Sequence, residues 1–235
     1  MKVIILAGGF GTRLGEMTDK IPKPMVPIGN KPILMHIMEL FASYGHTDFL
    51  IATGYKEEII RNYFIKNPTE WNIKTINTGT ETLTGGRVKK ISKYIDNERC
   101  FLTYGDGLSN INLDKLLKFH CEKNKIATIS AVRPPARFGE LYLNEDIVVS
   151  FEEKPQLQKG WINGGFFVLE PDFYNYIDDD NVMLEREPIN KVTNDKQLVA
   201  YRHNGFWQCM DTRRDWELLE SLVQKGNPPW KEIDE

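Results

Sequence analysis

A glycine-rich turn followed by two basic residues is the stretch of this sequence that is best suited to chemistry. The turn covers residues 8–11 and directly follows a short apolar run, and Arg13 and Lys23 come soon after it. Glycines leave the backbone N–H groups of a turn open to an anion, and basic side chains bring positive charge to the same place. Residues 1–31 carry five basic and two acidic side chains, a local net charge of +3, although the whole chain carries −3. The stretch therefore predicts a phosphate-binding site.

Two better-known glycine loops do not fit this turn. A P-loop requires Lys-Ser or Lys-Thr after its last glycine, and neither pair follows here. A dinucleotide-binding fingerprint requires a third glycine, and Leu14 occupies that position. A glycine turn that binds no ligand stays open as an alternative from these residues alone.

Two aspartates are candidate ligands of a divalent cation. Asp106 lies between two glycines after an apolar stretch at 100–104, where a parallel sheet presents functional groups. Asp211 precedes a helical pattern at 213–224. Mg²⁺ on a nucleotide usually takes one or two carboxylates together with phosphate oxygens, so this pair suits it. Each aspartate also has a structural interpretation, Asp106 in an Asp-Gly turn and Asp211 as the N-cap of the helix.

Polar groups in the second half could bind a sugar phosphate. Glu153 and Lys154 follow an apolar stretch and could hold a sugar hydroxyl and a phosphate, although a solvated charged turn explains them slightly better from the residues alone. Asn163 and Gly164 supply an amide and exposed backbone, which suit sugar hydroxyls or a simple turn. The acidic run at 178–180 predicts a solvated loop. The four histidines lack the spacing of a zinc site or a catalytic triad.

Apolar strands alternate with amphipathic helices through the first half of the chain. The expected strands are residues 3–7, 49–52, 73–76, 100–104 and 127–132, and the expected helices are residues 32–43, 57–64, 87–95 and 113–124. Such alternation predicts an α/β fold with a doubly wound, mainly parallel mixed sheet, and it places ligands at the carboxyl ends of the strands. Residues 82–86 predict a second glycine loop before a helix.

The second half predicts an antiparallel extension on the sugar side. Residues 141–143 and 147–151 are expected to pair antiparallel and to extend the same sheet. A strand is expected at 166–169, directly after residues 163–165, and a further strand is expected at 198–203. These pieces would cover one lip of the ligand-binding cleft.

The length, composition and net charge of the chain limit the class of protein. The 235 residues are 41% hydrophobic and 27% charged, which suffices for a sizeable core. We expect one domain, with a nucleotide-binding part at roughly 1–132 and a sugar-binding part at roughly 133–235. A net charge of −3 gives no support to nucleic-acid binding, and no apolar run is long enough to span a membrane. Three widely spaced cysteines without a Cys-x-x-Cys pair indicate reduced thiols, so we expect a cytoplasmic protein.

Nine short motifs together resemble the sugar-1-phosphate nucleotidylyltransferases. The general motifs are LAGGFGTRL at 6–14, PKPM at 22–25, YGDG at 104–107, EKP at 153–155 and NGGFF at 163–167. Four further motifs resemble the cytidylyltransferase branch, which acts on glucose 1-phosphate. They are TGGR at 84–87, PPARFG at 134–139, GFWQCMDT at 205–212 and NPPWK at 227–231. The resemblance covers nearly the whole chain. One departure is that the chain is shorter between Tyr63 and Trp71 than members of that branch.

The resemblance implies a Rossmann-like nucleotidyltransferase fold and a role for each matching position. The implied nucleotide-binding residues are Leu6, Ala7, Gly8, Gly9, Gly11, Thr12, Arg13, Lys23, Gly85, Arg87 and Asp106. Glu153, Lys154, Asn163 and Gly164 would bind the sugar phosphate, and Asp106 and Asp211 would hold Mg²⁺. Arg13, Lys23 and Lys154 would be the catalytic cations. The implied partners are a nucleoside triphosphate and a sugar 1-phosphate, and the chain would form a homo-oligomer.

The expected reaction follows from charge. A sugar 1-phosphate has a second pKa near ~6, so its oxygen is mostly ionised at neutral pH and needs no general base. That oxygen would attack the α-phosphorus of CTP in line, giving CDP-glucose and pyrophosphate, while the cations offset the developing negative charge. Two alternatives stay open. One is a nucleotidylyltransferase for another base or sugar phosphate, and the other is a regulatory protein that binds nucleotide sugars without turnover.

Overall fold

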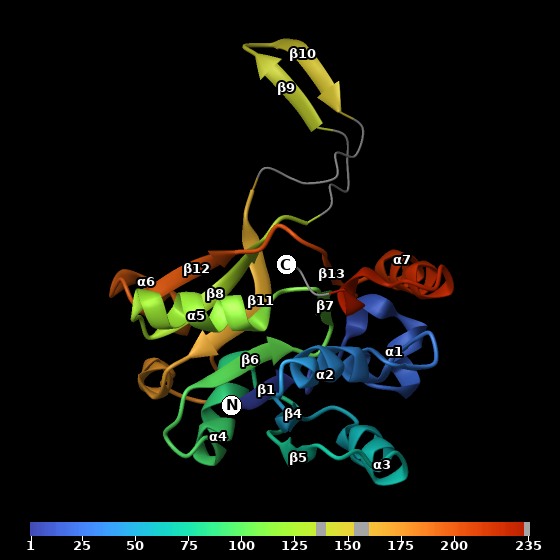
Figure 1. Ribbon diagram of the computed structural model, residues 1–235, viewed down its shortest axis with the longest axis vertical. Coiled ribbons are helices and arrows are strands. Elements are labelled where there is room, and N and C mark those ends of the chain that lie inside the picture. Colours follow the sequence, from blue (N-terminus) through green and yellow to red (C-terminus); the bar gives the residue numbers. More distant parts are fainter. Residues whose placement is uncertain (135–139, 153–159, 233–235) are drawn as a thin grey trace.

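A seven-stranded mixed sheet forms the centre of the molecule. The computed structural model describes residues 1–134, 140–152 and 160–232 (Figure 1). The strands of the sheet are β1 (Lys2–Leu6), β4 (Asp48–Thr53), β5 (Asn72–Asn77), β6 (Cys100–Tyr104), β8 (Ala127–Val132), β11 (Ile162–Leu169) and β12 (Leu198–Arg202). Their spatial order is β12-β8-β11-β6-β1-β4-β5, and β11 runs antiparallel to both of its neighbours while the other pairs are parallel. This arrangement confirms the predicted doubly wound, mainly parallel sheet.

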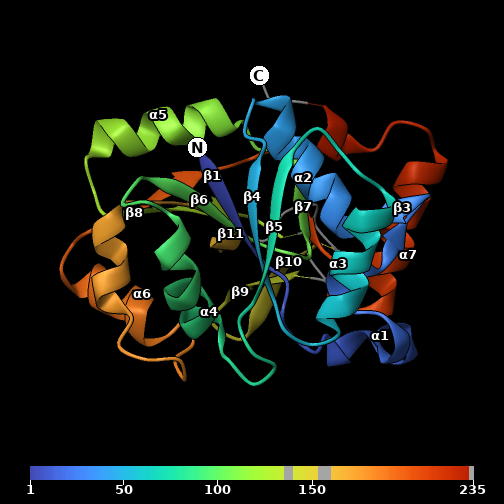
Figure 2. The ribbon, with the colours of Figure 1, turned by 90° about the horizontal axis from the view of Figure 1, so that it is seen from below.

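Helices cover both faces of this sheet. One face carries α2 (Ile33–Ser43), α3 (Glu57–Lys66), α5 (Leu113–Lys123) and α7 (Arg213–Gln224), and the other carries α4 (Thr84–Ile91) and α6 (Glu187–Asn194). Figure 2 shows α2 and α3 on one side of β1 and α4 and α6 on the other. Along β1, Val3 and Ile5 enter one core cluster and Ile4 and Leu6 enter the other. A continuous apolar strand is therefore required here, because both of its faces are buried. No helix in the described parts of the chain is long and apolar enough to cross a membrane.

Several short elements surround the loop that follows β1. They are α1 (Glu16–Lys20), β2 (Pro27–Ile28), β3 (Lys31–Pro32), β7 (Gly107–Ser109) and β13 (Trp207–Cys209). β2 pairs with β3, and β7 pairs with β13, each as an antiparallel two-stranded sheet. The short 3-10 segments are Thr12–Leu14, Lys23–Met25, Ser92–Tyr94, Pro171–Tyr176 and Pro229–Lys231.

The hairpin of β9 (Glu140–Asn144) and β10 (Ile147–Glu152) does not extend the main sheet, contrary to the prediction. The two strands pair antiparallel, as expected, but they form a sheet of their own. The reason lies in β8, which precedes the hairpin in the chain and is already paired on both sides, with β11 and β12. Figure 1 shows the hairpin standing apart from the body of the molecule. The antiparallel strand that does join the main sheet is β11.

Two glycine motifs lie in regular elements, and for the motif at residues 82–86 this contradicts the predicted loop. Gly85 and Gly86 belong to α4, which begins at Thr84 and ends at Ile91. A Cβ atom on Gly86 would lie 2.2 Å from the backbone oxygen of Asp180. These glycines therefore serve a close approach between α4 and a neighbouring segment. Asn163 and Gly164 lie inside β11, at an irregularity in its pairing with β8, so the simple turn that the sequence left open does not form there.

Candidate active site

A short ribbon brings two distant aspartates together. Asp106 follows β6 and directly precedes β7, and β7 pairs with β13 so that Gly107 lies opposite Cys209. The backbone N–H of Met210 then donates to the backbone oxygen of Asp106 at 2.8 Å. Asp211, the next residue, is thereby placed beside Asp106 at the carboxyl end of the central strands. The predicted partnership of these two residues is thus matched by their positions.

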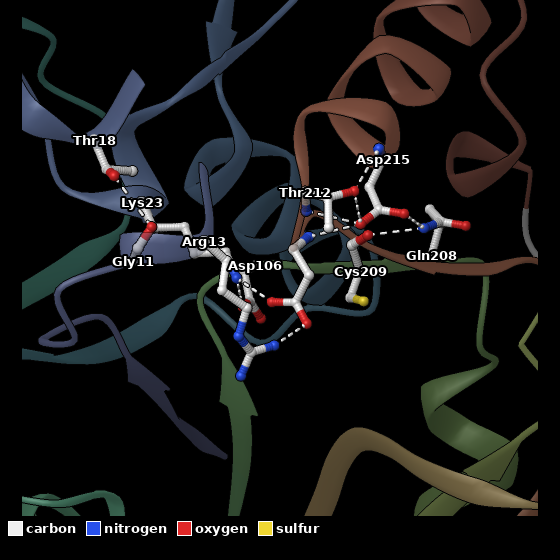
Figure 3. Close-up of polar contacts among 10 residues, drawn as sticks. Gly11, Arg13, Thr18, Lys23, Asp106, Gln208, Cys209, Thr212 and Asp215 are labelled. Atoms are coloured by element: carbon white, nitrogen blue, oxygen red, sulfur yellow. Dashed lines mark hydrogen bonds and ion pairs between the residues drawn. The ribbon is translucent and has the colours of Figure 1, made fainter. Parts of the chain in front are cut away.

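The side chain of Lys23 lies between the two carboxylates. Its Nζ atom is 2.6 Å from Oδ2 of Asp106 and 2.6 Å from Oδ1 of Asp211 (Figure 3). Burial alone would lower the pKa of Lys23, but the two carboxylates outweigh it and hold that pKa above its ordinary value. Arg13 donates to Oδ2 of Asp211 at 2.6 Å, and its side chain is 73% exposed. The site therefore contains one buried and one accessible cation around a pair of acids.

Asp211 is not the N-cap of α7. That position belongs to Thr212, whose hydroxyl accepts from the backbone N–H of Asp215, while Oδ2 of Asp215 accepts from the backbone N–H of Thr212. This reciprocal capping box satisfies two N–H groups at the helix start. Oδ2 of Asp215 also accepts from the backbone N–H of Asp211 at 3.2 Å, and Figure 3 shows Asp215 turned toward Thr212. The cap thus fixes the backbone of Asp211, and its carboxylate points to Lys23.

A cavity of about 430 Å³ opens above the glycine turn. It is lined by ten of the eleven residues that the resemblance assigns to nucleotide binding, namely Leu6, Ala7, Gly8, Gly9, Gly11, Thr12, Arg13, Lys23, Arg87 and Asp106. Gly85 is the exception, because it is buried in α4 against the backbone of Val182. Thr82, Thr84 and Met183 complete one wall of the cavity.

The side chain of Arg87 donates a hydrogen bond to the backbone of the glycine turn. Its guanidinium is almost fully buried and donates to the backbone oxygens of Gly8, Thr53 and Thr80 at 2.9, 3.0 and 3.1 Å, and to the hydroxyl of Thr78 at 2.6 Å. Desolvation lowers the pKa of Arg87. A Cβ atom on Gly8 would lie 2.0 Å from the guanidinium, so any larger residue there would displace Arg87 from its hydrogen bonds. Arg87 borders the cavity, and its guanidinium binds the backbone of the glycine turn.

A second cavity of about 420 Å³ adjoins the first. Asn163 and Gly164 line it, and the indole N–H of Trp207 donates to the backbone oxygen of Gly164 at 2.7 Å. Tyr104, Asp106 and Asp211 line both cavities. The two cavities therefore meet at the acidic pair. Glu153 and Lys154, the other residues expected to bind the sugar phosphate, lie outside the described residues.

The sequence interpretation missed two linked residues, of which Tyr104 lines both cavities and Glu185 contacts Tyr104. Tyr104 donates its hydroxyl to Oε1 of Glu185 at 2.6 Å. Burial and the Glu185 carboxylate raise the pKa of Tyr104, so the phenol stays protonated. The position of Tyr104 at the end of an apolar strand, two residues before Asp106, could have identified it. No sequence pattern distinguishes Glu185, because it is one exposed acidic residue within an irregular segment.

The other polar residues considered from the sequence lie elsewhere. No histidine and no member of the acidic run at 178–180 lines either cavity, as far as the structure describes their walls. Asp178 pairs with Lys191 and Asp180 with Lys90, which agrees with the expectation of a solvated loop. Within the described ranges, no cluster of three or more side chains offers a complete metal site. Two carboxylates at the mouth of a nucleotide-sized cavity do fit a Mg²⁺ ion whose remaining ligands are phosphate oxygens and water.

Comparison with known proteins identifies related sequences over nearly the whole chain. The family described as "Nucleotidyl transferase" matches residues 2–216. Glucose-1-phosphate cytidylyltransferase of Salmonella typhimurium is 42% identical, over 98% of this chain and 99% of the relative. The probable glucose-1-phosphate cytidylyltransferase of Bacillus subtilis is 39% identical with the same coverage. The alignment of 254 positions with the Salmonella protein exceeds the 235 residues of this chain, so the relative contains insertions.

Solved structures resemble the whole fold. The crystal structure of HddC from Yersinia pseudotuberculosis, complexed with GMP-PN, superposes with a TM-score of 0.76 and 27% identity, over 94% of this chain and 99% of that one.

Proposed function

The chain belongs to the nucleotidyl transferase family, and from this premise we propose that it transfers CMP from CTP to α-D-glucose 1-phosphate, giving CDP-glucose and pyrophosphate. The observation that carries the proposal is the meeting of two cavities at Asp106, Asp211 and Lys23. A transferase with two separate anionic substrates needs adjoining sites with a shared centre. The extent of the similarity to cytidylyltransferases supports CTP and glucose 1-phosphate as the pair.

The nucleotide would occupy the cavity above the glycine turn. The backbone of Leu6 to Gly9 would hold the base and ribose, and the turn at Gly11 and Thr12 would close over the triphosphate. Arg13 is exposed and can move to a phosphate, since one of its five N–H donors is bonded to Asp211 and the guanidinium has four others. Arg87 would act through the turn, by fixing the Gly8 carbonyl, rather than by touching the nucleotide.

The sugar phosphate would occupy the second cavity. Asn163 lines that cavity and offers an amide to a sugar hydroxyl, beside the backbone of Gly164. Lys154 would bind the sugar phosphate and Glu153 a sugar hydroxyl, on the strength of the resemblance alone. The nucleophilic oxygen of the phosphate would then face the shared wall formed by Asp106 and Asp211.

The reaction would proceed as a single in-line displacement. The phosphate oxygen attacks the α-phosphorus, a new P–O bond forms, and the bond to pyrophosphate breaks. Lys23 has three N–H donors and uses two on the carboxylates, which leaves one for a phosphate oxygen. Asp106 and Asp211 would hold Mg²⁺, which when bound supplies positive charge to the phosphates.

Pyrophosphate release tests the proposal. Four common nucleoside triphosphates are each combined with several sugar 1-phosphates in the presence of Mg²⁺. The proposal expects the highest kcat/KM for CTP with glucose 1-phosphate. A higher value for another pair would support the alternative base or sugar, and no release from any pair would support the regulatory alternative.

A further inference from the structure

One chain of hydrogen bonds connects the two cavities through Glu185. Oε1 of Glu185 accepts from the hydroxyl of Tyr104 at 2.6 Å, and Oε2 accepts from the hydroxyl of Thr84 at 2.7 Å. Tyr104 in turn accepts from Nδ2 of Asn163 at 3.3 Å. Thr84 lines the nucleotide cavity and Asn163 lines the sugar cavity. A single carboxylate therefore reaches both sides of the site.

The segment that carries Glu185 is itself part of the nucleotide cavity. Met183 lines that cavity, and the backbone N–H of Leu184 donates to the Thr84 hydroxyl at 2.9 Å. The backbone N–H of Gly85 donates to the oxygen of Val182 at 3.0 Å. The Thr84 hydroxyl therefore links the start of α4 to this segment and to Glu185. Removing the Glu185 carboxylate would release one of the bonds that hold the wall in place.

On the sugar side, the same chain sets the orientation of an amide. Oδ1 of Asn163 accepts from the backbone N–H of Gly165 at 2.8 Å, so the other end of the amide is the N–H₂ group. One N–H of that group donates to Tyr104, whose own proton goes to Glu185. The second N–H of Asn163 is then a donor for a sugar oxygen. Glu185 thereby determines, through Tyr104, which hydrogen-bonding role Asn163 offers.

We propose that Glu185 is a positioning residue that couples the nucleotide cavity to the sugar-phosphate cavity, acting through Thr84 on one side and Tyr104 on the other. This inference rests on the proposed function. Both carboxylate oxygens of Glu185 act as acceptors, and a glutamine has only one acceptor oxygen. Glu185→Gln therefore breaks one bond or mispairs both, with little change in side-chain volume.

The test uses three variants with distinct expected patterns. Thr84→Val removes the nucleotide-side link and should raise the KM for CTP about fivefold. Tyr104→Phe removes the link on the sugar side and should raise only the KM for glucose 1-phosphate, also about fivefold. Glu185→Gln should raise both KM values about fivefold, with kcat within about twofold of the unmodified enzyme. Glu187→Gln, a matched charge change at an exposed acid that pairs with Lys191, should leave both KM values unchanged. A merely structural role would lower the melting temperature without this separation of substrates.

The outcomes separate the coupling from the proposed function. Unchanged KM values in Glu185→Gln, or equal effects of all three variants on both substrates, would overturn the coupling while the reaction stands. If the unmodified protein releases no pyrophosphate, the proposed function fails. Calorimetric titration with CTP and with glucose 1-phosphate then tests the coupling. The coupling requires that Glu185→Gln binds both ligands more weakly than the unmodified protein. Unchanged affinity of Glu185→Gln for both ligands would overturn the coupling.

Discussion

The backbone N–H of Met210 donates to the backbone oxygen of Asp106 over 2.8 Å, and this bond sets the register at which two distant parts of the chain enter the candidate active site. β7 and β13 are only three residues each, yet they place the Asp106 and Asp211 side chains on either side of one ammonium. The arrangement depends on main-chain pairing, so it persists when a single side chain is altered. The charge of each side chain can therefore be tested separately from the fold.

Asp106→Asn should abolish most of the activity without unfolding the protein. The amide keeps the size of the carboxylate but loses the charge that Lys23 and a divalent cation require, so kcat should fall by about 10²-fold or more. Pyrophosphate release measures the loss, and the melting temperature checks the fold. Asp178→Asn, at an exposed acid that pairs with Lys191, is the matched control. An active Asp106→Asn enzyme would contradict the metal-binding role.

Arg87→Met should destabilise the protein and weaken nucleotide binding together. The substitution removes the four hydrogen bonds that the guanidinium donates, although the backbone oxygens of Gly8 and Thr53 keep donors from Tyr55 and Thr78. A hydrogen bond from a charged group contributes about 1.5–3 kcal/mol, so the free energy of unfolding should fall by at least about 2 kcal/mol. Denaturant unfolding measures this change, and the KM for the nucleotide should rise. If stability were unchanged and only the KM rose, Arg87 would instead contact the ligand directly.

Thr212→Ala should affect both helix stability and turnover. The lost cap costs about 1 kcal/mol, and the backbone of Asp211, bonded to the same Asp215 carboxylate, is held less firmly. We expect a lower melting temperature and a reduced kcat. Thr212→Ser retains the hydroxyl and should resemble the unmodified protein in both measurements. Equal loss in the alanine and serine variants would show that the methyl group matters and the cap does not.

The free energy of unfolding should decrease as the pH falls below about 6.5. His36 is buried, its Nε2 atom bonds to the oxygen of Ile28 at 2.9 Å, and its Nδ1 atom accepts from the indole of Trp230 at 3.2 Å. Burial lowers the pKa of His36, with a smaller contribution from Lys31. The unfolded chain, with a histidine pKa near ~6.5, therefore binds more protons than the folded protein below that pH. Stability present above pH ~6.5 is lost as the pH falls through the folded-state pKa.

Unfolding in denaturant at a series of pH values between about 7.5 and 5 checks this prediction. His36→Gln can still donate to Ile28 but cannot titrate, so its stability should be lower at neutral pH and depend less on pH. An equal slope in both proteins would assign the pH dependence to other groups. His46 and His120, whose pKa values are also lowered by burial, are the first of these.

The sequence allowed the main sheet and most of the candidate site to be predicted, for identifiable reasons. Residues 3–7 read as a strand because both faces of β1 are buried, and Asp106 stood out because it follows such a strand. The family assignment from short motifs is confirmed by the match over residues 2–216. The roles of the individual site residues, including Glu153 and Lys154, and the division near residue 132 stay predictions.

The errors share one physical cause, which is that tertiary contacts override local pattern. Gly85 and Gly86 have the pattern of a loop, but they belong to α4 and their lack of a Cβ atom permits the close approach of residues 180–184. The hairpin of β9 and β10 has the pattern of a sheet extension, but β8 has no open edge to receive it. Glu185 carries no local signal, because its importance arises from the distant residues Tyr104 and Thr84.

The shared wall of Tyr104, Asp106 and Asp211 has a consequence for how such an enzyme can diversify. The remaining lining of each cavity belongs to one compartment alone, with Thr82 and Met183 on one side and Trp207 and Gly164 on the other. Substitutions in one compartment can alter which base or which sugar is accepted while the reacting centre is inherited intact. New donor and acceptor combinations can therefore evolve, or be engineered, one pocket at a time.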